Sequence, residues 1–90
     1  MIDPSLPGAD LVARGLEDLA RNVESAEALL VSIGAPRLRR IGVAVPAALP
    51  SPERRLYELL ARSDSDSAHS RYNALVRRLV RFERALECAV

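Results

Sequence analysis

The chain has 90 residues, of which 49% are hydrophobic and only three are aromatic, and 13 arginines against 12 acids leave a net charge of +1. One domain with a thin core is expected, because a chain of this size buries only about 60% of the surface exposed on unfolding. The charge gives no indication of a polyanionic partner, no apolar run is long enough to span a bilayer, and the single Cys88 excludes an intrachain disulfide.

The first predicted elements are a flexible N-terminal segment over 1–8 and a long helix over 9–34, which opens a single helical domain over 9–90. Apolar residues recur at alternating spacings of four and three along the helix, as in a heptad repeat. They are Val12, Leu16, Leu19, Val23, Ala26, Leu30 and Ile33. Gly34 and Pro36 predict its end. A kink or break at Gly15 or near Asn22 is the main alternative.

A short helical turn is predicted over 36–41, followed by Gly42, and then a crossover connection over 43–52 that contains three prolines. Alternation of Ile41, Val43 and Val45 leaves a strand as an alternative, although no second strand is available to pair with it. Ser51 and Pro52 suit the N-cap and first position of a helix over 52–62.

The last predicted helix, over 67–89, has the strongest pattern in the chain. An apolar seam with spacings of 3, 4, 3 and 4 predicts lengthwise packing on another helix. The seam consists of Tyr72, Leu75, Leu79, Phe82 and Leu86. The fold class is therefore predicted to be all-α, a small helical bundle of three main helices plus a short helical turn, with heptad-like apolar seams on its two long helices.

Charge is distributed unevenly along the sequence. Residues 1–34 carry six acids against two arginines, a balance of −4, and the remainder carries eleven arginines against six acids, a balance of +5. The pairs Asp10–Arg14 and Glu17–Arg21 have the favourable i,i+4 order. Since the outer faces of the first and last helices would carry opposite charges, they would not fully neutralise each other within one chain, and association is expected.

Candidate partner-binding residues lie on the last helix. Arg77, Arg81 and Arg84 fall opposite the apolar seam, while Arg71 and Arg78 flank it and can reach Glu27 on the first helix. The complete set is Arg71, Arg77, Arg78, Arg81 and Arg84. An acidic protein surface, nucleic-acid phosphate and solvent alone are the alternatives for what meets these arginines.

Arg62 and His69 are separated by six residues, a spacing that resembles the R-x(4 to 6)-H signature of the HEPN ribonucleases. The resemblance covers these two residues and implies a helical bundle in which an arginine and a histidine act on RNA phosphate. Asp64 and Asp66 lack the glycine and later glutamate of a calcium loop and are interpreted as a capping turn. Cys88 has no base positioned by spacing to activate it.

The function predicted from these patterns is non-enzymatic protein interaction, as a homodimer or as the small accessory or antitoxin-like partner of another protein. The alternative is a nucleic-acid-binding regulator that uses the C-terminal arginines. No catalytic, cofactor, metal or small-molecule site is evident. Arginine-only basic usage, with no lysine, threonine or glutamine, favours a GC-rich bacterial source, and the lack of a secretory signal pattern favours the cytoplasm.

Overall fold

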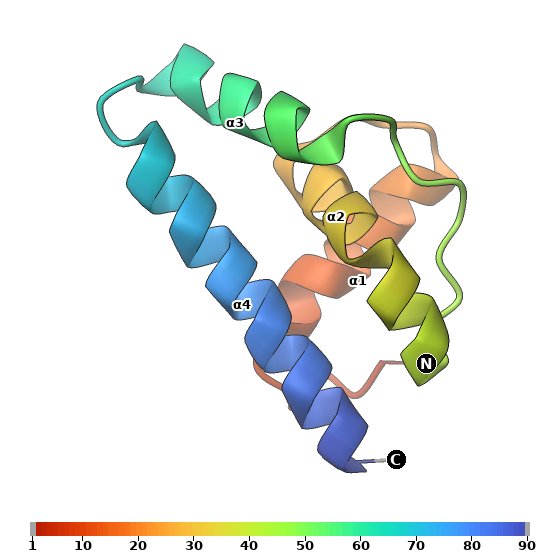
Figure 1. Cartoon of the computed structure of the whole chain (residues 1–90). Coiled ribbons are helices and arrows are strands. Elements are labelled where there is room, and N and C mark those ends of the chain that lie inside the picture. The colour runs from red at the N-terminus through yellow and green to blue at the C-terminus, as the bar shows by residue number, and fades with distance from the viewer. Residues whose placement is uncertain (1, 90) are drawn as a thin grey trace.

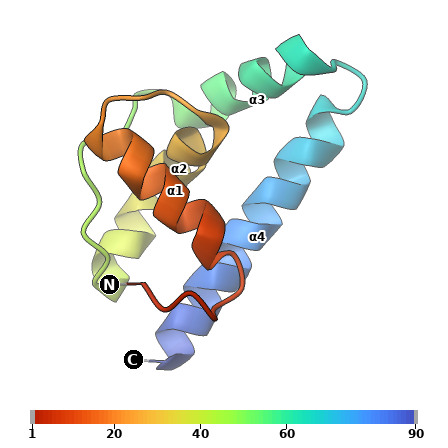
Figure 2. The same ribbon diagram turned by 180° about the vertical axis from the view of Figure 1, so that it is seen from behind.

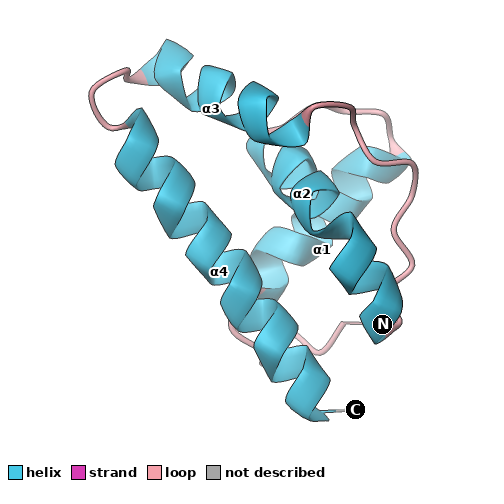
Figure 3. Cartoon of the chain, in the orientation of Figure 1, coloured by secondary structure: helices cyan, strands magenta, loops and turns pink. Residues whose placement is uncertain are grey.

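The computed structural model describes residues 2–89 and contains four helices joined by loops, with no strand in this range (Figures 1 and 3). The helices are α1 (Ala9–Ala20), α2 (Ala26–Ile41), α3 (Pro52–Ser63) and α4 (Ala68–Ala89). The predicted all-helical bundle is confirmed. None of the described helices is long and apolar enough to cross a bilayer.

The prediction of one long helix over 9–34 is wrong, because a loop separates α1 from α2. Asn22 adopts a left-handed conformation with φ of 57°, and the Val23 amide donates to the Asp18 carbonyl at 2.8 Å. Ser25 then starts α2: its Oγ accepts from the Ala28 amide at 3.0 Å and donates to Asp18 Oδ2 at 2.6 Å. The break is the alternative anticipated near Asn22, whereas α1 runs unbroken through Gly15.

The predicted stop at Gly34 and Pro36 is also wrong, because α2 continues through both residues to Ile41. Pro36 lacks the N–H that would bond to the residue 32 carbonyl, yet Leu38 beyond it is fully buried and fixes the final turns by packing. The predicted separate turn over 36–41 is therefore the end of α2. It stops at Gly42, as expected, where φ of 105° requires glycine.

The connection between α2 and α3 is a crossover without strand structure, as predicted. It is attached to α2 by side chains: the Leu49 amide donates to Ser32 Oγ at 3.0 Å, and Arg39 donates to the carbonyls of Val45 and Pro46. Pro52 begins α3 as expected, although the Ser51 side chain makes no capping hydrogen bond.

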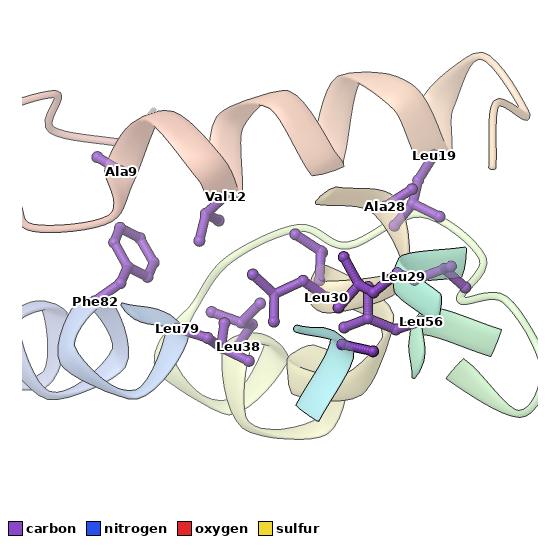
Figure 4. Close-up of a cluster of buried hydrophobic side chains, with 13 residues drawn as sticks. Ala9, Val12, Leu19, Ala28, Leu29, Leu30, Leu38, Leu56, Leu79 and Phe82 are labelled. Atoms are coloured by element: carbon purple, nitrogen blue, oxygen red, sulfur yellow. The ribbon is translucent and has the colours of Figure 1, made fainter. Parts of the chain in front are cut away.

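The other three helices are arranged around α2, which packs against each of them (Figures 1 and 2). Figure 4 shows the core between them, to which α2 contributes the most side chains. These are Ala28, Leu29, Leu30, Val31, Ala35 and Leu38. α4 packs along α2, as its seam predicts for another helix, whereas its contacts with α1 are few and include Gly8, just before the start of α1.

The predicted apolar seam of α4 faces this core. Leu79 and Phe82 are buried, whereas Tyr72, Leu75 and Leu86 are half-buried and pack against the core from its edge. Ile2 and Leu6 in the segment before α1 are also partly buried against the core. The flexibility expected for 1–8 stays a prediction, and Met1 and Val90, the ends of the two predicted regions, lie outside the described residues.

Candidate partner-binding face of α4

Three of the five candidate arginines form a basic face on the outside of α4. Arg77, Arg81 and Arg84 are spaced by four and three residues, so they share one side of the helix. All three are exposed, and within residues 2–89 none makes an ion pair or a side-chain hydrogen bond. We call these three residues the basic face.

The other two candidates, Arg71 and Arg78, are engaged within the chain. Arg78 Nη2 lies 3.5 Å from Asp10 Oδ1, which links α4 to α1. Arg71 Nη1 donates to Ser63 Oγ at 3.0 Å and links the start of α4 to the end of α3. Neither pairs with Glu27, the acid suggested by the sequence.

The acids of α1 already have partners within the molecule. Besides the Asp10 contact, Arg21 Nη2 lies 3.1 Å from Glu17 Oε1, as predicted, whereas Arg14 lies nearest to Asp18 rather than Asp10. Asp18 is buried and accepts from Ser25. The expectation that α1 and α4 would leave each other's charges unpaired therefore holds for the basic face but fails for the acids of α1.

A buried carboxylate on α4 was missed by the sequence analysis. Glu83 has a side chain only 4% exposed, and its Oε2 would lie 3.1 Å from a Cβ built on Gly34 of α2. Arg37 of α2 holds both acids of this side of α4: its Nη1 lies 3.5 Å from Glu83 Oε1, and its Nε donates to Glu87 Oε1 at 2.8 Å. The sequence did contain a signal for this burial: Glu83 follows Leu79 by four residues, which places it at the edge of the apolar seam.

The environment of Glu83 changes its acidity. Burial raises the pKa of the Glu83 carboxyl above its ordinary value near 4.5, while Arg37 opposes this change and Glu87 adds to it. The folded protein therefore binds the proton on Glu83 more tightly than the unfolded chain does. This contribution to stability is fully present below pH 4.5 and is lost as the pH rises through the raised pKa.

Glu83→Gln is expected to remove this pH-dependent loss. The free energy of unfolding of the variant should increasingly exceed that of the wild type from pH 4.5 upward, and the difference should level off above the raised pKa. Urea titrations followed by circular dichroism between about pH 4 and about pH 8 measure this difference.

Glu58→Gln provides a control for this experiment, because Glu58 is an exposed carboxylate with a side chain 61% accessible to solvent. The free energy of unfolding of the Glu58→Gln variant should vary with pH in the same way as that of the wild type. A constant difference between Glu83→Gln and the wild type at every pH would contradict the role of burial at Glu83.

The remaining candidates from the sequence are not brought together. His69 and Arg62 are both exposed, and the hydrogen bond of His69 is to Asn73 Nδ2 at 3.2 Å rather than to Arg62. Asp64 Oδ1 accepts from the Asp66 amide at 3.1 Å, which closes a turn between α3 and α4, and a capping role of this turn for α4 stays a prediction. Cys88 is exposed, and the described residues contain no cluster of three or more His, Cys, Asp or Glu suited to a metal ion.

The surroundings of the basic face are partly apolar. Val76 and Val80 are half-buried and lie within one helical turn of Arg77, Arg81 and Arg84. The tyrosines of this region pair with each other instead: the ring centroids of Tyr57 on α3 and Tyr72 on α4 are 6.0 Å apart at an angle of 56°. The surface is therefore a row of guanidinium groups beside aliphatic side chains.

Comparison of the chain with protein-family models, with curated proteins and with solved structures finds no match.

Proposed function

We propose that this chain is a non-enzymatic protein-interaction module that binds an acidic surface of a separate partner protein through the basic face. The observation that carries the proposal is that three exposed arginines without an ion pair within residues 2–89 lie together on one face of α4, whereas six of the other ten arginines are paired with acids. Within residues 2–89, each of the following arginines forms an ion pair with an acid: Arg14, Arg21, Arg37, Arg54, Arg55 and Arg78. The basic face has no such acids and is open to those of a partner.

A protein partner fits this face better than nucleic acid does. Arginine is enriched at protein interfaces, where its apolar stem and planar head contact both aliphatic and acidic groups, and Val76 and Val80 supply the aliphatic border. Single-stranded nucleic acid is usually bound by basic grooves with aromatic side chains that stack on bases. Both tyrosines of the chain lie at the α3–α4 contact rather than on the basic face.

A separate partner fits better than a second copy. In a symmetric dimer built on this face, the two-fold axis would place arginines against arginines, which is unfavourable. A copy that instead presented α1 would bring acids already engaged by Arg78, Arg21 and Ser25. The acids of α1 therefore do not supply the complement of this face. We propose that the complementary acids belong to another protein, and we place this accessory role in the bacterial cytoplasm.

The expected result is that Arg77→Glu with Arg81→Glu abolishes capture of the partner. Like charges placed at an interface disfavour the complex strongly, so a loss of affinity of about a hundredfold is expected. The tagged full chain is used to capture proteins from a bacterial cytoplasmic extract, and the recovered complex is then titrated with wild-type and variant protein. The affinity of the partner protein for the wild-type chain should also fall as the salt concentration rises.

Arg40→Glu with Arg62→Glu is the matched control, because both residues are exposed, lie on other helices and have no ion pair in the described part of the chain. It changes the net charge equally and should leave the partner bound. Equal binding by both double variants would contradict the proposal. Recovery of nucleic acid alone, seen by its ultraviolet absorbance, would support the regulator alternative instead.

A further inference from the structure

A second surface lies at the end of the bundle where the two termini and the end of α2 come together (Figure 2). Four parts of the chain border a cavity of about 600 Å³ there, which is open to solvent on one side: the N-terminal segment, α1, the end of α2 with the loop after it, and the last turns of α4. Its lining consists of Ile2, Ala13, Leu16, Ile41, Gly42, Val43, Ala44 and Leu86. The side chains of all these residues are uncharged and apolar, and most of the lining is apolar, so the cavity suits a hydrocarbon group.

A smaller, polar hollow of about 470 Å³ adjoins this cavity and shares Ile41 with it. Its other lining residues are Arg37, Arg40 and Glu87. Arg37 is occupied by Glu87 and Glu83, whereas Arg40 is exposed and makes no ion pair within residues 2–89. An apolar cavity therefore opens beside one cationic group that is available to a ligand.

We propose that this cavity binds a small amphipathic anion, of the class of aliphatic carboxylates, with its hydrocarbon tail among Leu16, Val43 and Leu86 and its carboxylate on Arg40. Typical ligand cavities measure about 300–1,000 Å³, are mostly apolar and carry a few polar groups that fix orientation. The volume and lining match that description.

The shape of the site favours a small molecule over a partner helix. A docked helix needs a long groove that receives side chains from several of its turns. This cavity is instead bordered by four short stretches of chain that converge at one end of the molecule. It is independent of the basic face, because Leu86 lies on the opposite side of α4 from Arg77, Arg81 and Arg84.

The test uses decanoate, below its critical micelle concentration, titrated into the full chain by isothermal calorimetry. Saturable one-to-one binding is expected, with binding also of decanol and none of acetate. Arg40→Gln should weaken decanoate binding by about twofold to fivefold, the upper part of the range for one exposed ion pair, and should leave decanol binding unchanged. Arg62→Gln, at another exposed and unpaired arginine, should change neither.

Ala13→Phe tests the placement of the tail, because Ala13 is exposed, lines the cavity and can accept a larger side chain that fills it. Binding of both decanoate and decanol should be lost while circular dichroism shows an intact fold. Ala44→Phe serves the same purpose if the first variant does not fold. The proposal is overturned if the wild type gives no saturable binding, if Arg40→Gln binds decanoate normally, or if filled cavities still bind both ligands.

Discussion

Phe82→Ala is expected to lower the free energy of unfolding by about 3–5 kcal/mol. Phe82 is fully buried, and truncation removes both the hydrophobic contribution of its ring and the contacts that its neighbours make with it. A chain of 90 residues has a total stability of only about 5–13 kcal/mol. The variant should therefore be close to unfolded under conditions in which the wild type is stable.

The position of Phe82 explains why no neighbour compensates for its loss. Figure 4 shows its ring directed from α4 toward Ala9 and Val12 of α1. Its Cβ also lies 3.3 Å from the position that a Cβ on Gly8 would take, just before α1. Because α1 and α4 share few other contacts, the ring is the principal apolar link between these two helices.

Urea denaturation followed by circular dichroism measures the effect of Phe82→Ala, and Leu75→Ala is the control on the same seam. Leu75 is only half-buried, so its truncation should shift the transition much less. Similar shifts for the two variants would mean that the half-covered edge of α4 contributes as much as the buried link to α1, contrary to the packing described above.

The sequence predicted the helical elements well where local patterns and packing agree. The start of a helix at Pro52, the end of helical structure at Gly42 and the core-facing side of α4 are all confirmed, although the turn predicted before Gly42 is the end of α2. At each of these places a backbone preference or an apolar period coincides with the tertiary contact. Where local preferences agree with the fold in this way, the structure of a segment can be predicted from its sequence.

The prediction of a continuous helix over 9–34 was wrong because a heptad pattern gives the spacing of apolar residues and does not show whether the helix is interrupted. Val23 fits the period, yet in the structure it is 46% exposed within the loop between α1 and α2. The Asp18–Ser25 hydrogen bond stabilises the break, and asparagine at position 22 tolerates the left-handed backbone that the break requires. Serine, asparagine and aspartate side chains favour such local alternatives to helix, so the composition of this stretch carried the correct signal.

For the candidate site, the sequence predicted which arginines share one face of α4, but it did not predict which acids pair with the arginines. Helical spacing identified the basic face, because the angular position of a residue follows from its number alone. Spacing cannot show which acid another helix places nearby, so the partners of Arg78 and Arg71 and the burial of Glu83 emerged only from the packing of the helices. The cavity near Arg40 also required the structure, because four separate stretches of chain form its wall.

Gly15→Ala is the second substitution with a large expected effect, because α1 and α2 leave no room for a side chain at this residue. A Cβ built on Gly15 would lie 2.4 Å from the Glu27 carbonyl oxygen and 2.4 Å from Val31 Cγ2. Relief requires the backbones of the two helices to separate. We expect a loss of about 2 kcal/mol, since overpacking costs about 1–3 kcal/mol or more and exceeds the roughly 1 kcal/mol gained in helix propensity.

Thermal and urea denaturation of Gly15→Ala should be compared with those of Gly34→Ala. At Gly34 the nearest atoms to an added Cβ are side-chain atoms of Leu79 and Glu83, at 3.0–3.1 Å, which can move without displacing a helix. The gain in helix propensity should then offset much of the cost. If Gly15→Ala were as stable as the wild type, this would contradict the tight packing of α1 against α2 at Gly15. Destabilisation at Gly15 alone would establish that glycine is needed there for packing rather than for flexibility.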